Sequence, residues 1–258
     1  AMIRNPLINS KGMHTSALFG FVNQIMKLIN TEKPDLMIAA FDSPQKTFRH
    51  ERYSEYKATR EKMPEEMIEQ LPYLWNILES MDIPLLEEPG FEADDIIGTL
   101  ATKASKKGLD VFIVSGDKDF MQLINDKIFL YAPSGRQADI KIYDREGVIE
   151  KWGVPPEKII DLLGLMGDPS DNVPGVLGVG EKTAVKLINE YGSLESSLDN
   201  ANHVKNKRAR EGLLNSKENA ILSKELVTIE TQMDLEINLS QLKTNNIKKE
   251  SLARIFQE

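Results

Sequence analysis

The chain contains no cysteine, no long hydrophobic run and no excess of positive charge. Without cysteine it can form neither a disulfide nor a metal site with thiolate ligands. No apolar stretch reaches the length of a membrane span or of a secretory signal. The three histidines, His14, His50 and His203, lack the spacing of metal ligands or of a catalytic triad, so we assign them no chemistry. These absences predict a soluble protein of a reducing cytoplasm without a membrane partner.

The net charge of −8 argues at first against a nucleic-acid partner, because phosphate binding usually leaves a basic surface. Many of the 40 acidic residues, however, stand where metal ligands would stand, and bound divalent ions would cancel part of their charge. The lysines and arginines also cluster, and local charge decides binding. A length of 258 residues suits one large domain or two closely packed lobes.

The hydrophobic pattern alternates between strand and helix in the first part of the chain. Apolar spacing predicts helices over residues 16–29 and 91–106. Short apolar runs predict strands at residues 35–41, 83–86, 111–114 and 128–131. This order predicts an α/β fold with a mostly parallel central sheet flanked by helices.

The remainder of the chain is predicted to be helical. From Pro155 onward the helices break at residues 175–180, at 191–192 and around Asn215. Pro64 is expected at the first helical position of a further helix. Trp75 and Trp152 lie in helical patterns and are expected in the core rather than as platforms for stacking bases.

Acidic residues recur where apolar runs end or helices begin. These candidate metal ligands are Asp42, Glu92, Asp94, Asp95, Asp117, Asp119, Asp168 and Asp171. Each cluster also has a plainer interpretation, such as an acidic helix start or a Gly-Asp turn. Their recurrence favours a shared site instead, since oxygen ligands suit Mg²⁺ or Mn²⁺ together with phosphate. The pattern is typical of a phosphodiester hydrolase.

A glycine-rich turn runs through residues 167–184 and carries Gly175, Gly178, Gly180, Lys182 and Thr183. Its glycines permit close backbone approach, and the following helix would direct free N–H groups at a phosphate. A Walker A loop is excluded, because Glu181 stands where that motif needs lysine. The pattern favours an element of the helix-hairpin-helix type that holds a nucleic-acid backbone without reading bases.

Two basic groups complete the candidate residues. Lys57 and Arg60 lie in the charged stretch 48–60, which is either a solvated helix face or a group that holds a scissile phosphate. Lys205, Lys207 and Arg208 form a second group, with Arg210, that is either solvated or in contact with a duplex.

In this order and spacing, the motifs resemble the 5′-nuclease domains of bacterial DNA polymerase I, in the flap endonuclease family. The resemblance spans nearly the whole chain and rests on the motifs Phe91-Glu92-Ala93-Asp94-Asp95, Ser115-Gly116-Asp117-Lys118-Asp119, the pair Gly167-Asp168 with Asp171-Asn172, and Gly175 to Ala184. It implies a PIN-like 5′-nuclease fold with a metal-dependent core at residues 1–160, a helical arch at about 44–80, and a helical DNA-binding region at 161–258. A helix-three-turn-helix would occupy about 165–192.

The resemblance also implies an activity. Of two Mg²⁺ or Mn²⁺ ions, Glu92, Asp94, Asp95 and Asp117 would hold or support one and Asp119, Asp168 and Asp171 the other, with Asp42 acting through water. Lys57 and Arg60 would contact the scissile phosphate, and the helix-three-turn-helix would bind the downstream duplex together with a K⁺ ion. The implied enzyme is a monomer that removes 5′ flaps and RNA primers at the nucleoid, beside a polymerase domain in the same polypeptide.

One departure from the family pattern leaves an alternative open. The family begins with a buried strand that carries Asp-Gly, and its Asp is a metal ligand; this sequence starts after that point. We therefore weigh the nuclease against a catalytically impaired, structure-specific DNA-binding fragment. A related ribonuclease of the same α/β metal-site class is a further rival, which the duplex-binding turn disfavours.

Overall fold

The structure is a computed structural model that describes residues 7–134, 139–235, 242 and 252. The chain divides into two compact units, one made of residues 1–41, 61–87 and 235–258 and the other of residues 42–60 and 88–234. Most of the last part of the predicted helical region 161–258, after residue 235, lies outside the described residues. None of the helices in the described part is long and apolar enough to cross a membrane.

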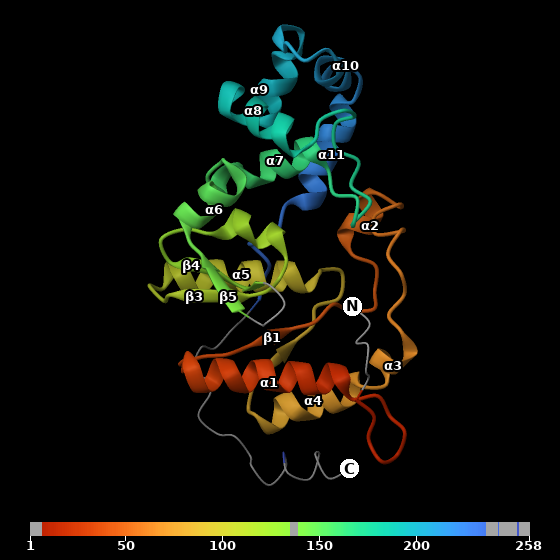
Figure 1. The fold of residues 1–258 in the computed structure, drawn as a ribbon, viewed down its shortest axis with the longest axis vertical. Coiled ribbons are helices and arrows are strands. Elements are labelled where there is room, and N and C mark those ends of the chain that lie inside the picture. Colours follow the sequence, from red (N-terminus) through yellow and green to blue (C-terminus); the bar gives the residue numbers. More distant parts are fainter. Residues whose placement is uncertain (1–6, 135–138, 236–241, 243–251, 253–258) are drawn as a thin grey trace. The chain divides into compact units, whose positions relative to one another are not determined.

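The first unit packs two helices against each other beside a short parallel strand pair (Figure 1). Its elements are α1 (Ser16–Thr31), β1 (Ala39–Ala40), α3 (Glu65–Ile68), α4 (Leu71–Ser80) and β2 (Leu85–Leu86). Val22 and Ile25 of α1 share an apolar cluster with Ile77 and Leu78 of α4. Gln70 is buried and its side-chain oxygen accepts from the first free N–H groups of α1, those of residues 17 and 18, at 3.1 Å each.

Three expectations for this unit need correction. The predicted strands 35–41 and 83–86 shorten to two residues each, paired in parallel with Ala39 opposite Leu85. Pro64 is the N-cap of α3 rather than its first helical residue. Trp75 is exposed because α4 turns Leu74, Ile77 and Leu78 to the core, which places the intervening position on the opposite face.

The second unit is built on a three-stranded sheet in the order β3-β4-β5. Its first elements are α2 (Phe48–Arg52), α5 (Ala93–Lys106), β3 (Val111–Val114), the 3₁₀ helix η1 (Lys118–Leu123), β4 (Ile128–Ser134), β5 (Asp139–Tyr143) and α6 (Arg145–Trp152). β3 runs parallel to β4 with Val111 opposite Ile128, as the alternation of helix and strand predicted. β5 returns antiparallel to β4, an addition that the apolar pattern did not indicate. Trp152 is buried, as expected.

The helices that follow α6 form a group above it in the view of Figure 1. It comprises η2 (Pro156–Lys158), α7 (Ile159–Met166), α8 (Glu181–Tyr191), α9 (Leu194–Asp199), η3 (Ala201–His203), α10 (Lys207–Asn215) and α11 (Lys217–Val227). The predicted helix breaks at residues 175–180, at 191–192 and near Asn215 are confirmed, because each falls between two of these helices. Leu162, Leu163 and Leu165 of α7 are almost fully buried and form the centre of this group.

The segment after α11 returns along α5 and ties the helical group to the sheet region. Gln122 bonds the carbonyl of Val227 and the N–H of Ile229, both at 2.9 Å. Thr99 donates to the carbonyl of Glu230 at 3.2 Å. Gly98 makes this close approach possible, because a Cβ there would lie 2.5 Å from the Ile229 side chain. The helices and the sheet region thus share one framework within the second unit.

Candidate acidic and nucleic-acid-binding site

All the candidate acids lie in the second unit, at turns and helix starts. Glu92 is the N-cap of α5, Asp94 lies in the first turn of that helix, and Asp117 follows β3 as the N-cap of η1. Asp168 and Asp171 belong to the turn after α7. Asp42 accepts the N–H of Ala93 at 2.8 Å, which fixes it beside the start of α5. The fold therefore brings together carboxylates that are far apart in the sequence.

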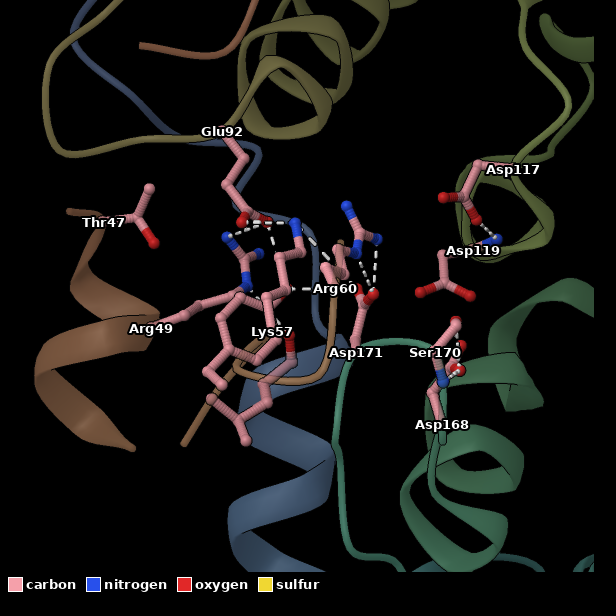
Figure 2. Close-up of polar contacts among 12 residues, drawn as sticks. Thr47, Arg49, Lys57, Arg60, Glu92, Asp117, Asp119, Asp168, Ser170 and Asp171 are labelled. Atoms are coloured by element: carbon pink, nitrogen blue, oxygen red, sulfur yellow. Dashed lines mark hydrogen bonds and ion pairs between the residues drawn. The ribbon is translucent and has the colours of Figure 1, made fainter. Parts of the chain in front are cut away.

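Glu92 is the centre of a buried polar group (Figure 2). Its carboxylate is paired with Lys57 Nζ at 2.6 Å and lies 3.4 Å from Arg49 Nη1. The hydroxyl of Tyr56, which is only 4% exposed, donates to Glu92 Oε2 at 3.2 Å. Burial and the charge of Glu92 raise the pKa of Tyr56, so this hydroxyl stays protonated as a donor.

Asp95 differs from the other candidates because its carboxylate is fully committed to the framework. It is completely buried and accepts both Nη groups of Arg49, at 2.7 and 2.8 Å. It also accepts the N–H groups of Glu92 at 3.0 Å and Glu230 at 2.9 Å. With its acceptors satisfied by protein donors in this conformation, Asp95 positions Glu92, which is the supporting role among the two expected for it; direct contact of Asp95 with a metal stays a prediction.

Arg49 carries this framework across three segments. Besides Asp95, its guanidinium donates to the carbonyls of Leu226 at 2.8 Å and Thr228 at 2.7 Å. The fork geometry of arginine suits such a set of acceptors, and lysine could not supply it. Arg49 thereby joins α2 and the start of α5 to the end of α11. No periodic pattern marked this residue in the sequence, since it is one of several charged residues in the polar stretch 48–60.

The turn that carries Lys57 and Arg60 lies directly against the loop of Asp171. The Lys57 N–H donates to the carbonyl of Asp171 at 2.9 Å, and the Asn172 side chain donates to the carbonyl of Glu55 at 2.7 Å. Arg60 Nε donates to the Asp171 carboxylate at 2.9 Å. Lys57 and Arg60 thus lie among the acids, as the interpretation of a phosphate-holding group requires.

Asp168 is paired with Lys118, a residue to which the sequence motifs alone assigned no role. Lys118 Nζ lies 2.7 Å from Asp168 Oδ2, and the Ser170 N–H donates to Oδ1 at 2.8 Å. Burial alone would raise the pKa of Asp168, but the bonds from Lys118 and Ser170 outweigh it and lower that pKa. In the sequence, the position of Lys118 between Asp117 and Asp119 was the feature that could have indicated a role for this lysine in the acidic site.

Asp94 and Asp119 are the acids with the least compensation. Burial is the main cause that raises the pKa of each of these two carboxyls to about 7, and the negative charge of Asp117 is the second. Asp119 Oδ1 is buried without a hydrogen-bond partner, whereas Asp117 Oδ1 accepts the Asp119 N–H at 2.9 Å. Figure 2 shows the Asp119 carboxylate between Asp117 and the Asp168 turn. Such crowded, unpaired carboxylates are the arrangement that a bound cation would stabilise.

The donors fit hard divalent cations in their chemistry, because all are carboxylate oxygens and one buried oxygen has no other partner. In the conformation shown, no three histidine, aspartate or glutamate side chains of the described residues converge closely enough to hold a metal ion. In this conformation, Glu92, Asp168 and Asp171 are each paired with a cationic side chain instead.

The glycine-rich turn divides into a buried and an exposed half. Gly175 is buried, and a Cβ there would lie 2.5 Å from the Gly167 nitrogen, so Gly175 packs the turn against the end of α7 rather than facing a ligand. Its expected contact with DNA stays a prediction. Gly178 adopts a φ of +84° beneath the Arg208 side chain, and Gly180 is the exposed N-cap of α8.

Exposed basic side chains surround the outer half of this turn. Lys182 lies in the first turn of α8 and is exposed, whereas Thr183 is half-buried. Lys205 and Lys207 are also exposed, and Leu177 at the tip of the turn is 75% exposed. This surface combines free helix N–H groups with positive charge, which suits a phosphate backbone.

Comparison with known proteins agrees with this geometry. Residues 1–153 match the family model of the 5′-3′ exonuclease N-terminal resolvase-like domain, and residues 154–250 match the 5′-3′ exonuclease C-terminal SAM fold. The chain is 42% identical to a 5′-3′ exonuclease of Aquifex aeolicus, covering 98% of this chain and 84% of that protein.

Longer relatives contain the same region. DNA polymerase I of Bacillus subtilis is 44% identical over 98% of this chain, which spans 29% of the length of that polymerase. A structure of the bacteriophage T5 flap endonuclease with DNA and metal ions has a TM-score of 0.72 at 22% identity, covering 93% of this chain and 89% of the other, and so shares the fold. On this sequence similarity and fold, the chain belongs to the 5′-3′ exonuclease family.

Proposed function

We propose that the chain hydrolyses phosphodiesters of branched DNA from the 5′ end, removing 5′ flaps and RNA primers in a metal-dependent reaction. One observation carries the proposal: Asp119, which has a buried oxygen without a partner, lies beside Asp117 in the same polar group as the carboxylates that pair with Lys57 and Arg60 (Figure 2). This combination offers both cation ligands and phosphate-binding groups in one place.

The residues divide into two candidate ligand groups. Glu92, Asp94 and Asp117 would hold one divalent ion, with Asp42 acting through water; Asp119, Asp168 and Asp171 would hold the other. When bound, a pair of Mg²⁺ or Mn²⁺ ions would lower the pKa of the attacking water and neutralise negative charge at the leaving oxygen. Asp95 stays outside both groups, because Arg49 and backbone N–H groups already engage its carboxylate.

The reaction is an in-line attack of water on phosphorus. The bond to the 3′ oxygen breaks, which leaves a 3′-hydroxyl on the released piece and a 5′-phosphate on the duplex. Lys57 and Arg60 bind the phosphate oxygens and stabilise the developing negative charge. No protein general base is needed. Tyr56 holds the orientation of Glu92 through its buried hydroxyl.

Substrate choice would follow DNA shape rather than sequence. The N–H groups at Gly180 and the charge of Lys182 would bind the downstream duplex backbone, with Lys205, Lys207 and Arg208 extending the contact. A K⁺ ion held by backbone carbonyls of the turn belongs to the same proposal. The likeness to DNA polymerase I supports a role in the cytoplasm at the bacterial nucleoid, as a monomeric nuclease part of a longer polypeptide.

The test is cleavage of a 5′-flap DNA, labelled at its 5′ end, with Mg²⁺, Mn²⁺ or EDTA. We expect metal-dependent release of a short labelled product by the wild-type chain. Asp119→Asn and Asp168→Asn should abolish release and retain DNA binding, whereas the exposed Asp110→Asn should change neither. Turnover by Asp119→Asn at the wild-type rate would contradict the assignment of this residue.

A second candidate function is structure-specific DNA binding without catalysis. It is favoured by the ion pairs that occupy Glu92, Asp168 and Asp171 in the absence of a converged metal site among the described residues. Tight flap binding with no product in any metal would support it. Preference for single-stranded RNA over flapped DNA would instead favour the ribonuclease alternative.

A further inference from the structure

Cationic side chains are paired with three of the proposed ligands, and two of these carboxylates also have a second, more distant cation: Arg49 at 3.4 Å from Glu92 and Lys57 at 3.9 Å from Asp171. Lys57 Nζ lies 2.6 Å from Glu92 Oε1, and Lys118 Nζ lies 2.7 Å from Asp168 Oδ2. Arg60 is paired with the carboxylate of Asp171. Glu92 and Asp168 are each only 6% exposed, so an ionised carboxylate there needs a partner to stay charged.

The remaining ligands have no such partner. Within the part of the chain that the structure describes, Asp94, Asp117 and Asp119 take part in no ion pair, and Asp119 Oδ1 is buried without a hydrogen bond. The acidic site is thus divided into a half that the protein neutralises itself and a half that it leaves uncompensated.

The cations of the first half are more exposed than the structural arginine beside them. The side chains of Lys57, Lys118 and Arg60 are 16%, 31% and 47% exposed, against 3% for Arg49. Arg49 is also anchored by two backbone carbonyls, whereas the ammonium of Lys118 has Asp168 as its partner. A partly exposed lysine that is held by one carboxylate can leave it once a divalent ion supplies the positive charge that the buried carboxylate needs.

We propose that Lys118, together with Lys57 and Arg60, is an exchangeable counter-ion that occupies the acidic site until divalent cations displace it. The inference rests on the proposed function, since it assigns the metal ligands as above. Two consequences follow. Each of the two proposed ions takes at least one ligand from the paired half, so loading either ion requires cationic side chains to leave Glu92, Asp168 or Asp171. Once displaced, these groups become available to the phosphate of the substrate.

The first test measures Mn²⁺ binding to the full chain without DNA, by electron paramagnetic resonance of free Mn²⁺. Because a neighbouring positive charge opposes a divalent ion strongly in a half-buried site, Lys118→Met and Lys57→Met should bind Mn²⁺ about tenfold more tightly than wild type. Lys118→Arg, which keeps the charge, should resemble wild type. Lys127→Met, which removes an exposed lysine paired with Asp110, is the control and should stay within about twofold.

The second readout is independent of metal affinity. Mg²⁺ titration followed by NMR of the lysine ammonium groups should convert the ion-paired signals of Lys118 and Lys57 into freely exchanging ones, with assignments from the arginine variants. If Lys118→Met does not fold in EDTA, Lys118→Gln replaces it in the Mn²⁺ titration with the same expected result.

The outcomes separate this inference from the proposed function. Equal Mn²⁺ affinity in wild type, Lys118→Met and Lys57→Met overturns the exchange, as do ammonium signals that persist in saturating Mg²⁺, even if the chain cleaves flaps. A wild-type chain that neither binds Mn²⁺ nor cleaves DNA instead contradicts the proposed function. Tighter binding by both lysine variants, with wild-type affinity in Lys127→Met, supports the exchange.

Discussion

Replacement of Asp119 by asparagine should stabilise the metal-free protein at alkaline pH while it removes a proposed ligand. Burial and the charge of Asp117 raise the pKa of Asp119 from 3.8 to about 7 in the folded chain. The folded state therefore holds the proton more tightly than the unfolded state. The stability that the protonated Asp119 carboxyl contributes is complete below about pH 4 and is lost as the pH rises through about 7.

The magnitude follows from the size of this shift. One pKa unit corresponds to about 1.4 kcal/mol, so ionising Asp119 costs the folded state at most about 4 kcal/mol at pH 8. Asparagine avoids that cost, but it loses the attraction of Lys118 and brings an amide that needs a partner. We expect a net gain of about 1–2 kcal/mol at pH 8, or about 2–4 °C for each kcal/mol in a chain of this size.

The assay is denaturant unfolding in EDTA at pH 5 and pH 8, repeated at pH 8 in saturating Mn²⁺. Asp119→Asn should exceed wild type at pH 8, approach it at pH 5, and fall below it once Mn²⁺ stabilises the wild-type site. Asp110→Asn, at an exposed ion pair, should show no such pH dependence. A wild-type chain that is as stable as Asp119→Asn at pH 8 in EDTA would refute the assigned burial cost.

Three further predictions concern the framework around the site. Arg49→Met should cost about 3–5 kcal/mol in chemical denaturation, since it leaves a buried carboxylate unpaired, whereas the exposed Arg145→Met should cost less than about 1 kcal/mol. Gly212→Ala should lower the melting temperature and weaken duplex binding in a filter assay, because a Cβ there would lie 2.0 Å from the Leu177 carbonyl oxygen; unchanged values would contradict the close contact. Gly180→Ala has open space around its Cβ, so it should keep the melting temperature and still weaken duplex binding, and full binding would show that the backbone does not approach phosphate there. 

The sequence determined the kinds of element and the chemistry of the site. The periodicity of residues 111–114 and 91–106 predicted β3 and α5 nearly to the residue, because apolar spacing directly reflects which side chains face a core. The motif acids were predicted from their places at strand ends and helix starts, where a fold can bring distant segments together. The two-residue length of β1 and the presence of the antiparallel β5 were beyond this reasoning, since pairing partners and not local propensity decide them.

Only the tertiary structure decided which charges meet. Asp95 stands in the same short motif as Glu92, yet its carboxylate faces Arg49 from α2 while that of Glu92 faces Lys57. Lys118 was one more lysine in sequence and became the partner of Asp168, fifty positions away in the chain. Gly175 and Gly180 lie in one glycine-rich turn, but Gly175 is buried against the end of α7 whereas Gly180 is exposed with open space around it. The amino-acid sequence determines which charged and flexible residues the chain contains. Which charges pair depends on distances that arise only when segments remote in sequence pack together.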